Sequence, residues 1–216
     1  YMDIVIQGAG PAGCVAAILA SRLGLRVTLI DNQQANTFRG NAHYLNAYSL
    51  EILHQCGLPM STILQHATPR TYAHAMAYGS SLSRIYYRLN LIDEPDFSCR
   101  YDTIGRYGAA VSVPFSCVYA ELLKMMESRN IAIQWESTIK SVDMQHNIIT
   151  CQNRQGDEFE IETAYLIAAD GVNSGVRQLL FTPPSVTNHT QFVNITLHSS
   201  LSSFISEPSL LTWVLN

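Results

Sequence analysis

The chain opens with an apolar strand, a glycine-rich turn and a small-residue helix, and this succession constrains the fold more than any other feature. Residues 3–7 predict a buried strand, and the small residues after the turn predict a helix over about 12–22. Gly24 ends that helix, and a second apolar strand over 25–30 leads to Asp31. Strand, helix and strand together have the length of one βαβ unit. This part of the chain is therefore expected to be an α/β fold with parallel strands.

The turn has the spacing Gly8-x-Gly10-x-x-Gly13, directly between the strand and the helix. In this context Gly8 permits a tight turn, Gly10 lets a pyrophosphate approach the backbone, and Gly13 lets the helix pack closely on the strand. The helix N-terminus adds unpaired N–H groups and a positive dipole end. Asp31 can accept hydrogen bonds from ribose hydroxyls, and its charge disfavours a 2′-phosphate. The pattern predicts a site for FAD or NAD rather than NADP; the alternative is a glycine-rich turn followed by a surface acid.

The composition argues against several other classes of protein. Apolar residues make up 47% of the chain and charged residues 14%, which favours a packed core over disorder. The net charge is −4 and the basic residues are scattered, which argues against nucleic-acid binding and a membrane-surface anchor. No apolar run reaches the roughly 20 residues of a membrane helix. Five cysteines without a CxxC pair favour a reduced, cytoplasmic protein, and the histidines lack metal-ligand spacing, so no metal is expected.

The rest of the chain alternates between helical and strand-like segments. Residues 46–56 and 116–130 carry apolar positions at helical spacing. Between 131 and 170 lie five short strand-like segments, over 131–135, 138–144, 147–152, 158–163 and 164–170. We expect the first and last to be sheet strands and the middle three to form a β-meander. Beyond a pair of prolines, residues 190–201 and 209–216 are expected to be the first strands of a different sheet.

Three segments carry a resemblance to a known family. The turn reads GAGPAG, a sequence common in FAD enzymes, and residues 39–53 read RGNAHYLNAYSLEIL. Residues 165–180, YLIAADGVNSGVRQLL, contain a strand that ends in Asp-Gly and is followed by Ser-x-Val-Arg. In this order and at this approximate spacing, the segments resemble the FAD-dependent monooxygenases of the 4-hydroxybenzoate hydroxylase type over residues 3–181. The wider superfamily also includes geranylgeranyl reductases and flavin-dependent halogenases.

The resemblance implies a Rossmann-like FAD-binding domain with a three-stranded β-meander over residues 1–181. It implies the start of a substrate-binding domain, with a sheet of its own, over residues 182–216. It further implies cofactor contacts from the turn, from the end of the second strand, from the following loop, from the meander and from the Asp-Gly turn: Gly8, Gly10, Pro11, Ala12 and Gly13; Asp31 and Asn32; Arg39, Gly40 and Asn41; Ile139; and Asp170. In the family, Arg177 would brace the turn at Asp170. No catalytic residue is assigned.

Four positions depart from what is frequent in the family. Asn32, Asn41 and Tyr48 stand where arginine is frequent, and Phe115 stands where a flavin-contacting glutamine is common. Each change removes charge or hydrogen bonding near the cofactor. A charge-assisted hydrogen bond is worth about 1.5–3 kcal/mol, so several such losses weaken binding by orders of magnitude unless other residues compensate.

The end of the chain bears on how complete the fold is. Residues 182–216 contain no glycine, so the Gly-Asp segment that completes the nucleotide domain in this family is not expected here. Because the chain also begins at Tyr1, we expect a piece or a natural truncation of the family fold, with little hydroxylase activity by itself.

The resemblance implies a function for the full protein. FAD, reduced transiently by NAD(P)H, would hydroxylate a small aromatic or cyclic organic substrate through a flavin hydroperoxide. Two alternatives stay open: a related FAD-dependent reductase or halogenase, and a non-catalytic Rossmann scaffold that has lost tight flavin binding. The sequence indicates no oligomeric state.

Overall fold

The computed structural model describes residues 1–34, 44–69, 75–90, 110–181, 200, 203–205, 207, 209 and 211–215. The chain divides into two compact units that alternate along the sequence. The first comprises Tyr1–Asn41, Ile52–Met60 and Phe115–Ser185, and the second comprises Ala42–Glu51, Ser61–Pro114 and Val186–Asn216. The predicted division between 181 and 182 was a functional one, into cofactor and substrate domains, and as such it stays a prediction.

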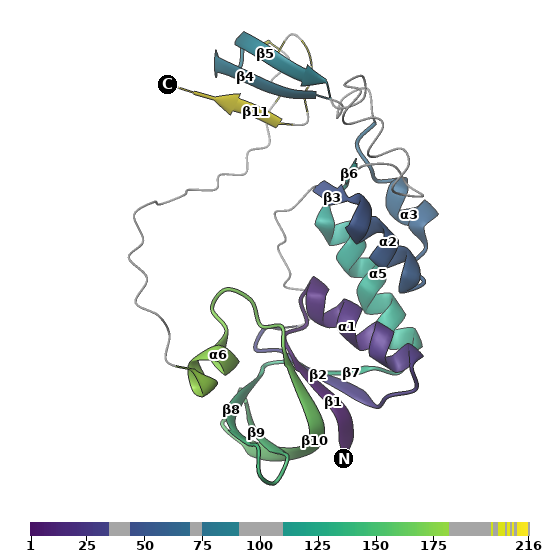
Figure 1. Ribbon diagram of the computed structural model, residues 1–216, viewed down its shortest axis with the longest axis vertical. Coiled ribbons are helices and arrows are strands. Elements are labelled where there is room, and N and C mark those ends of the chain that lie inside the picture. The colour runs from purple at the N-terminus through teal and green to yellow at the C-terminus, as the bar shows by residue number, and fades with distance from the viewer. Residues whose placement is uncertain are drawn as a thin grey trace. The chain divides into compact units, whose positions relative to one another are not determined.

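The first unit is built on one six-stranded sheet (Figure 1). Its strands are β1 (Met2–Gln7), β2 (Val27–Ile30), β7 (Ala132–Gln134), β8 (Ser137–Asp143), β9 (Ile148–Asn153) and β10 (Glu158–Ala168). They lie in the order β7-β2-β1-β10-β9-β8. The pairs among β7, β2, β1 and β10 are parallel, and those among β10, β9 and β8 are antiparallel. The parallel strands confirm the predicted α/β fold, and the antiparallel ones confirm the meander.

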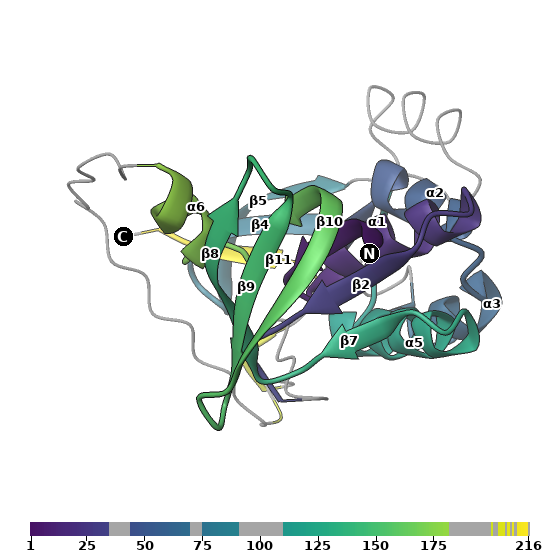
Figure 2. The ribbon, with the colours of Figure 1, turned by 90° about the horizontal axis from the view of Figure 1, so that it is seen from below.

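Strand β10 belongs to both halves of this sheet. We predicted two separate strands, over 158–163 and 164–170, and this was wrong: the segment is a single strand of 11 residues. Its first half pairs with β9, with Phe159 opposite Cys151, and its second half pairs with β1 (Figure 2). The segment contains no glycine, proline or asparagine, so nothing in it favours a turn.

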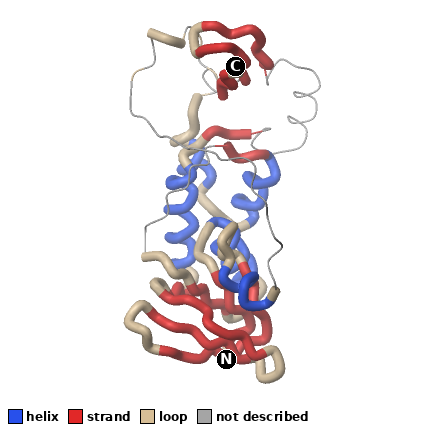
Figure 3. Tube along the Cα trace, turned by 90° about the vertical axis from the view of Figure 1, so that its left-hand side faces the viewer, coloured by secondary structure: helices blue, strands red, loops and turns tan. Residues whose placement is uncertain are grey.

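Helices cover the parallel strands of the first unit. They are α1 (Pro11–Arg22) and α5 (Phe115–Ser128), which lie side by side, and α1 also contacts β1 and β2 (Figures 1 and 3). Pro11 occupies the first turn of α1, where its missing N–H costs no hydrogen bond. Both helices confirm the sequence prediction to within one or two residues.

A short helix, α6 (Gly175–Leu180), contacts β8 of the meander. One apolar cluster joins α6 to the sheet and the meander: Val5, Ile30, Ile139, Ile149, Cys151 and Val176. Because β1, β2, β8 and β9 all contribute to this cluster, burial of its apolar surface holds the meander against the parallel strands.

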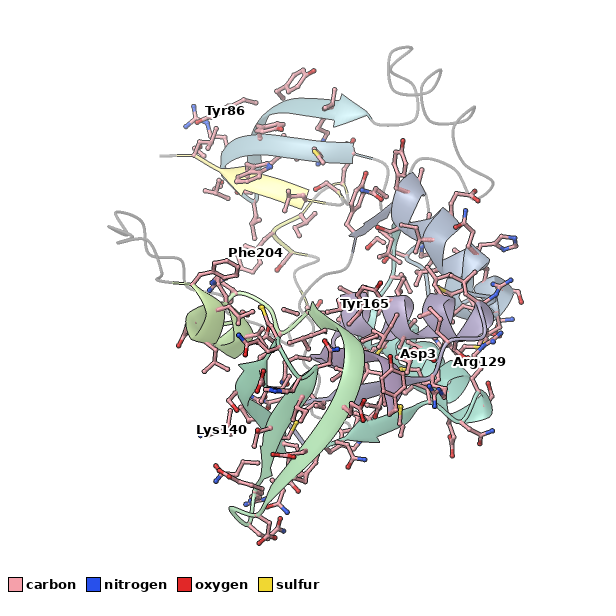
Figure 4. The ribbon with its side chains drawn as sticks, turned by 60° about the horizontal axis from the view of Figure 1, so that its bottom comes forward. Asp3, Tyr86, Arg129, Lys140, Tyr165 and Phe204 are labelled. Carbon is pink, nitrogen blue, oxygen red and sulfur yellow. The ribbon has the colours of Figure 1, made fainter. Side chains whose placement is uncertain are left out.

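The second unit contains two small sheets. Its elements are β3 (Tyr44–Asn46), α2 (Ala47–Gln55, whose last residues belong to the first unit), α3 (Met60–Leu64), β4 (Ala75–Ser81), β5 (Arg84–Asn90), β6 (Ala110–Ser112) and β11 (Leu211–Val214). Strands β11, β4 and β5 form one sheet in that order, and β3 pairs with β6. Figure 4 shows Tyr86 on β5, where it is exposed. Helix α2 and strand β11 confirm the predicted helix over 46–56 and strand within 209–216. The predicted strand over 190–201 lies, apart from Ser200, outside the described residues.

Candidate cofactor site

A cleft of about 640 Å³ lies at the carboxyl ends of β1, β2 and β10. The N-terminus of α1, strand β8 and the turn before α6 bound it. Its lining comes from the glycine-rich turn, the end of β2, β8 and the Asp-Gly turn: Gln7, Gly8, Gly10, Pro11, Ala12, Asp31, Asn32, Gln33, Thr138, Ile139, Ala169, Asp170, Gly171, Val172, Asn173, Gly175 and Val176. In open α/β sheets, ligands bind at this edge.

The three glycines of the turn have different surroundings. Gly8 has a φ of +103°, and a Cβ there would collide with the carbonyl oxygen of Ala169. A Cβ on Gly13 would collide with the carbonyl oxygen of Gly8, so Gly13 is the contact between helix and turn. A Cβ on Gly10 would meet no atom within 4 Å. The packing of the described residues therefore does not require a glycine at position 10. Open space beside the backbone is expected where a ligand approaches it closely.

Helix α1 presents an uncompensated N-terminus to the cleft. Gly10 is its N-cap and provides no side-chain hydrogen bond, and the first turn contains no acidic residue. The first N–H groups of a helix lack intrahelical acceptors, and the dipole places partial positive charge there. The described residues that line the cleft include no Lys or Arg, and this helix end contributes positive potential there.

Asp31 is hydrogen-bonded to the backbone on two sides. Its Oδ2 accepts from the N–H of Ala9 at 2.6 Å, and its Oδ1 accepts from the N–H of Gln33 at 2.8 Å. Each carboxylate oxygen has a second lone pair for another donor. The neighbouring Asn32 is exposed, and its Oδ1 accepts from Nε2 of Gln33 at 3.0 Å.

Two buried oxygens in the cleft wall have no hydrogen-bond donor among the described residues. They are Oε1 of Gln7 and Oδ1 of Asp170. Gln7 is only 5% exposed, and the other carboxylate oxygen of Asp170 accepts from the N–H of Val176 at 3.2 Å. Buried polar atoms in native proteins nearly always have partners, so these two oxygens call for a donor from outside the described chain.

The turn from Asp170 to Ser174 is fixed from α6. Nη2 of Arg177 donates to the carbonyl oxygen of Val172 at 2.6 Å, which confirms the bracing contact predicted for this arginine. Oγ of Ser174 accepts from the N–H of Arg177 at 3.0 Å and so caps α6. Gly171, with a φ of +80°, permits the sharp bend between Asp170 and Ser174.

Most of the predicted cofactor positions meet in this one cleft. Eight of them line it: Gly8, Gly10, Pro11, Ala12, Asp31, Asn32, Ile139 and Asp170. Gly13 is buried under the turn and does not line it. Three predicted positions lie outside the described residues: Arg39, Gly40 and Asn41. Asn41 is also one of the four departures from the family pattern. Of the other departures, Tyr48 is exposed on α2 and Phe115 begins α5.

The sequence reasoning missed several lining residues. Among them are Gln7, Thr138 and Ala169. Gln7 had a usable signal, because it is a polar residue that directly follows the apolar run Ile4–Ile6. Thr138 and Ala169 had none, since their place in the lining depends on how β8 and β10 meet the turn.

A second, more polar cleft of about 520 Å³ adjoins the first and shares Asn32, Gln33 and Thr138 with it. Here Nη1 of Arg154 contacts Oε1 of Glu136 at 2.6 Å, and this hydrogen bond lowers the pKa of Glu136. In the described part of the chain no cluster of His, Cys, Asp or Glu could hold a metal ion, and no helix there is both long and apolar enough to cross a membrane.

Comparison with known proteins identifies the family. The model of the FAD binding domain family matches residues 1–216. The chain belongs to this family. It is 26% identical over 220 residues to 2,4-dichlorophenol 6-monooxygenase of Cupriavidus pinatubonensis, covering 99% of this chain and 36% of that protein. It is 24% identical to an FAD-dependent monooxygenase of Aspergillus terreus, covering 83% of this chain and 24% of that one.

Solved structures show that this FAD-binding domain shares its fold with monooxygenases. The flavin-dependent monooxygenase PieE, in complex with FAD and substrate, superposes with a TM-score of 0.74 at 23% identity, covering 83% of this chain and 32% of that one. The p-nitrophenol 4-monooxygenase PnpA of Pseudomonas putida DLL-E4 superposes with a TM-score of 0.69 at 16% identity, covering 82% of this chain and 43% of that one. The chain thus spans about a third of the length of the first relatives it matches.

Proposed function

We propose that the 640 Å³ cleft binds FAD and that the chain is the cofactor-binding part of a flavin-dependent monooxygenase. The proposed enzyme hydroxylates a small aromatic or cyclic compound and takes its electrons from NAD(P)H. Family membership supports the cofactor, and the names of the relatives support the reaction class. The single observation that carries the proposal is the joint position of Gly10, Asp31 and Asp170 around one cleft at the carboxyl edge of the sheet.

The residues present fit FAD in three respects. The open side of Gly10 and the uncapped N-terminus of α1 suit a pyrophosphate, which needs close backbone approach and N–H donors. The unpartnered oxygens of Gln7 and Asp170 suit the hydroxyls of the ribose and ribityl groups, which are donors. The remaining lone pairs of Asp31, whose carboxylate already accepts two backbone N–H groups, suit the hydroxyls of the adenosine ribose.

Each residue has a proposed task. Gly10, Pro11 and Ala12 receive the pyrophosphate, and Asp31 accepts from the adenosine ribose through its remaining lone pairs. Ile139, 3% exposed on β8, offers backbone to the adenine. Asp170 accepts from a hydroxyl near the middle of the cofactor, with its turn held by Arg177. FAD would supply hydride acceptance and oxygen activation when bound, and this chain orients it and shields it from water.

The test uses the intact protein in which this chain occurs. Purified protein should show flavin absorbance and release FAD on denaturation. With a phenolic substrate it should consume O2 and NAD(P)H in step with the hydroxylated product. NAD(P)H oxidation that reduces a substrate without inserting oxygen would favour the reductase alternative. A colourless protein that cannot be reconstituted with FAD would overturn the proposal in favour of the scaffold.

A further inference from the structure

The residue between the first two glycines of the turn is held from three sides. The N–H of Ala9 donates to Asp31, as described above. Its carbonyl oxygen accepts from Oη of Tyr119 at 2.9 Å and from Sγ of Cys14 at 3.2 Å. Ala9 is 1% exposed, so water does not compete for these bonds. No sequence pattern indicates the contact from Tyr119, which comes from α5, 110 residues further along the chain.

The direction of the Ala9 carbonyl decides the direction of the next N–H. In a planar trans peptide, the C=O of one residue and the N–H of the next point in opposite directions. Because the carbonyl of Ala9 is directed at Tyr119 on α5, the N–H of Gly10 is directed away from α5. Gly10 lines the cleft and begins α1, so its N–H belongs to the set that would face a pyrophosphate.

We propose that Tyr119 is a positioning residue for pyrophosphate binding; this inference rests on the proposed function. The buried hydroxyl of Tyr119 fixes the orientation of the Ala9–Gly10 peptide and so directs the N–H of Gly10 towards the cofactor. Tyr119 does not line the cleft and is 7% exposed. Its effect is therefore transmitted through the backbone of the turn. Burial raises the pKa of Tyr119, so the hydroxyl remains a donor throughout the neutral range.

Cys14 is the second donor to the same oxygen and the weaker one. A thiol is a poorer hydrogen-bond donor than a phenol hydroxyl. Loss of Tyr119 alone leaves the Ala9 carbonyl with the thiol, and loss of both leaves a buried carbonyl with no side-chain donor among the described residues. The two residues should therefore be coupled, because they serve one acceptor.

The test compares three ligands in the intact protein and four variants. FAD, ADP and adenosine are titrated into apoprotein carrying Tyr119→Phe, Cys14→Ala, both substitutions, or Tyr165→Phe. Tyr165, exposed on β10, is the matched control for the loss of a phenol hydroxyl (Figure 4). The net contribution of one hydrogen bond corresponds to about a three- to tenfold change in the dissociation constant. Tyr119→Phe should therefore raise the dissociation constants of FAD and ADP by that factor. Adenosine, which has no phosphate, should bind unchanged, and Cys14→Ala should have the smaller effect.

The outcomes separate this inference from the proposed function. If the unsubstituted protein binds no FAD, the proposed function fails first. If it binds FAD, and Tyr119→Phe binds FAD and ADP as tightly as the unsubstituted protein, the positioning role is overturned. Equal weakening of FAD, ADP and adenosine also overturns it, because that result marks general damage. If Tyr119→Phe does not fold, 4-fluorophenylalanine at position 119, which keeps the ring and fills most of the space of the hydroxyl but cannot donate, decides. Weaker ADP binding with unchanged adenosine binding supports the role, and unchanged ADP binding contradicts it.

Discussion

The carboxylate of Asp31 accepts the backbone N–H of Ala9 over 2.6 Å and thereby ties the end of β2 to the glycine-rich turn after β1. A second bond, from the N–H of Gln33, fixes the same carboxylate from the other side. The acid that the motif assigns to a ribose therefore also has a structural task. In the proposed complex its orientation is set before the ligand arrives, which lowers the entropic cost of binding.

Replacing Asp31 should affect both stability and affinity. Asp31→Ala leaves the N–H of Ala9 without its acceptor, so we expect a loss of about 1–3 kcal/mol in the free energy of unfolding and FAD binding weaker by at least about tenfold. Asp31→Asn keeps one acceptor oxygen, so its stability and its FAD affinity should lie between those of Asp31→Ala and the unsubstituted protein. Urea denaturation and flavin titration measure the two effects. Asp3→Ala, which removes a half-buried acid paired with Arg26 at the start of β1, is the control for FAD affinity, and equal weakening of FAD binding at both positions would contradict the assignment.

The glycines at 10 and 13 should respond in opposite ways to alanine. Gly13→Ala drives a Cβ into the carbonyl of Gly8 and should prevent stable folding. Gly10→Ala meets open space at a φ of −69°, which alanine adopts freely, so the thermal unfolding midpoint should stay close to that of the unsubstituted protein. FAD affinity of Gly10→Ala should nevertheless fall at least about tenfold, because the new methyl group occupies the space of the ligand. Tight FAD binding by Gly10→Ala would show that the cleft is used differently.

Gln7→Val should stabilise the apoprotein and weaken the complex. The substitution removes a buried oxygen that has no donor among the described residues, and such a group costs about 1–3 kcal/mol. If that oxygen accepts a cofactor hydroxyl, the dissociation constant of FAD should rise about three- to tenfold. The readouts are chemical denaturation without flavin and titration with it. Gln145→Ala, at an exposed position in the β8–β9 turn, should change neither, and FAD binding unaltered by Gln7→Val would remove Gln7 from the site.

Arg177→Met should loosen the turn that carries Asp170. The substitution keeps most of the apolar stem but loses the 2.6 Å bond to the carbonyl of Val172. We expect faster amide hydrogen exchange over residues 170–174 and weaker FAD binding, with little change in global unfolding. Arg154→Met, which breaks a surface contact to Glu136, is the matched arginine control. Unchanged exchange in Arg177→Met would show that Ser174 and Gly171 hold the turn without it.

Alkaline pH should destabilise the first unit through Cys14. Burial, with a smaller contribution from the charge of Asp31, raises the pKa of this thiol from 9.0 to about 12. Above pH 9 the unfolded chain loses this proton while the folded protein keeps it, so the stability present below pH 9 is lost as the pH rises towards 12. Three pKa units set an upper limit of roughly 4 kcal/mol. The free energy of unfolding should fall less steeply above pH 9 in Cys14→Ala than in Cys117→Ala, and identical slopes would exclude this thiol.

The local sequence determined the elements of the cofactor half. The apolar segments, the glycine spacing and the helix signals between residues 3 and 31 act over a few residues, and the structure has the predicted strand, turn, helix and strand there. The helix at 115–128 and the meander follow from patterns that are equally local. The one clear error, the division of β10, arose because a strand that changes partner halfway has no turn residue to mark the change.

Tertiary structure decided which of these residues meet. The sequence by itself determined that Gly8, Gly10 and Asp31 lie at the ends of neighbouring strands, since βαβ geometry requires it. It did not determine that Oη of Tyr119 donates to the carbonyl of Ala9, or that Oε1 of Gln7 is buried in the cleft wall without a described donor. These relations depend on how α5 docks on α1 and how the meander closes against β1. Docking of this kind depends on the apolar surface buried by many side chains together, so no single sequence motif predicts it.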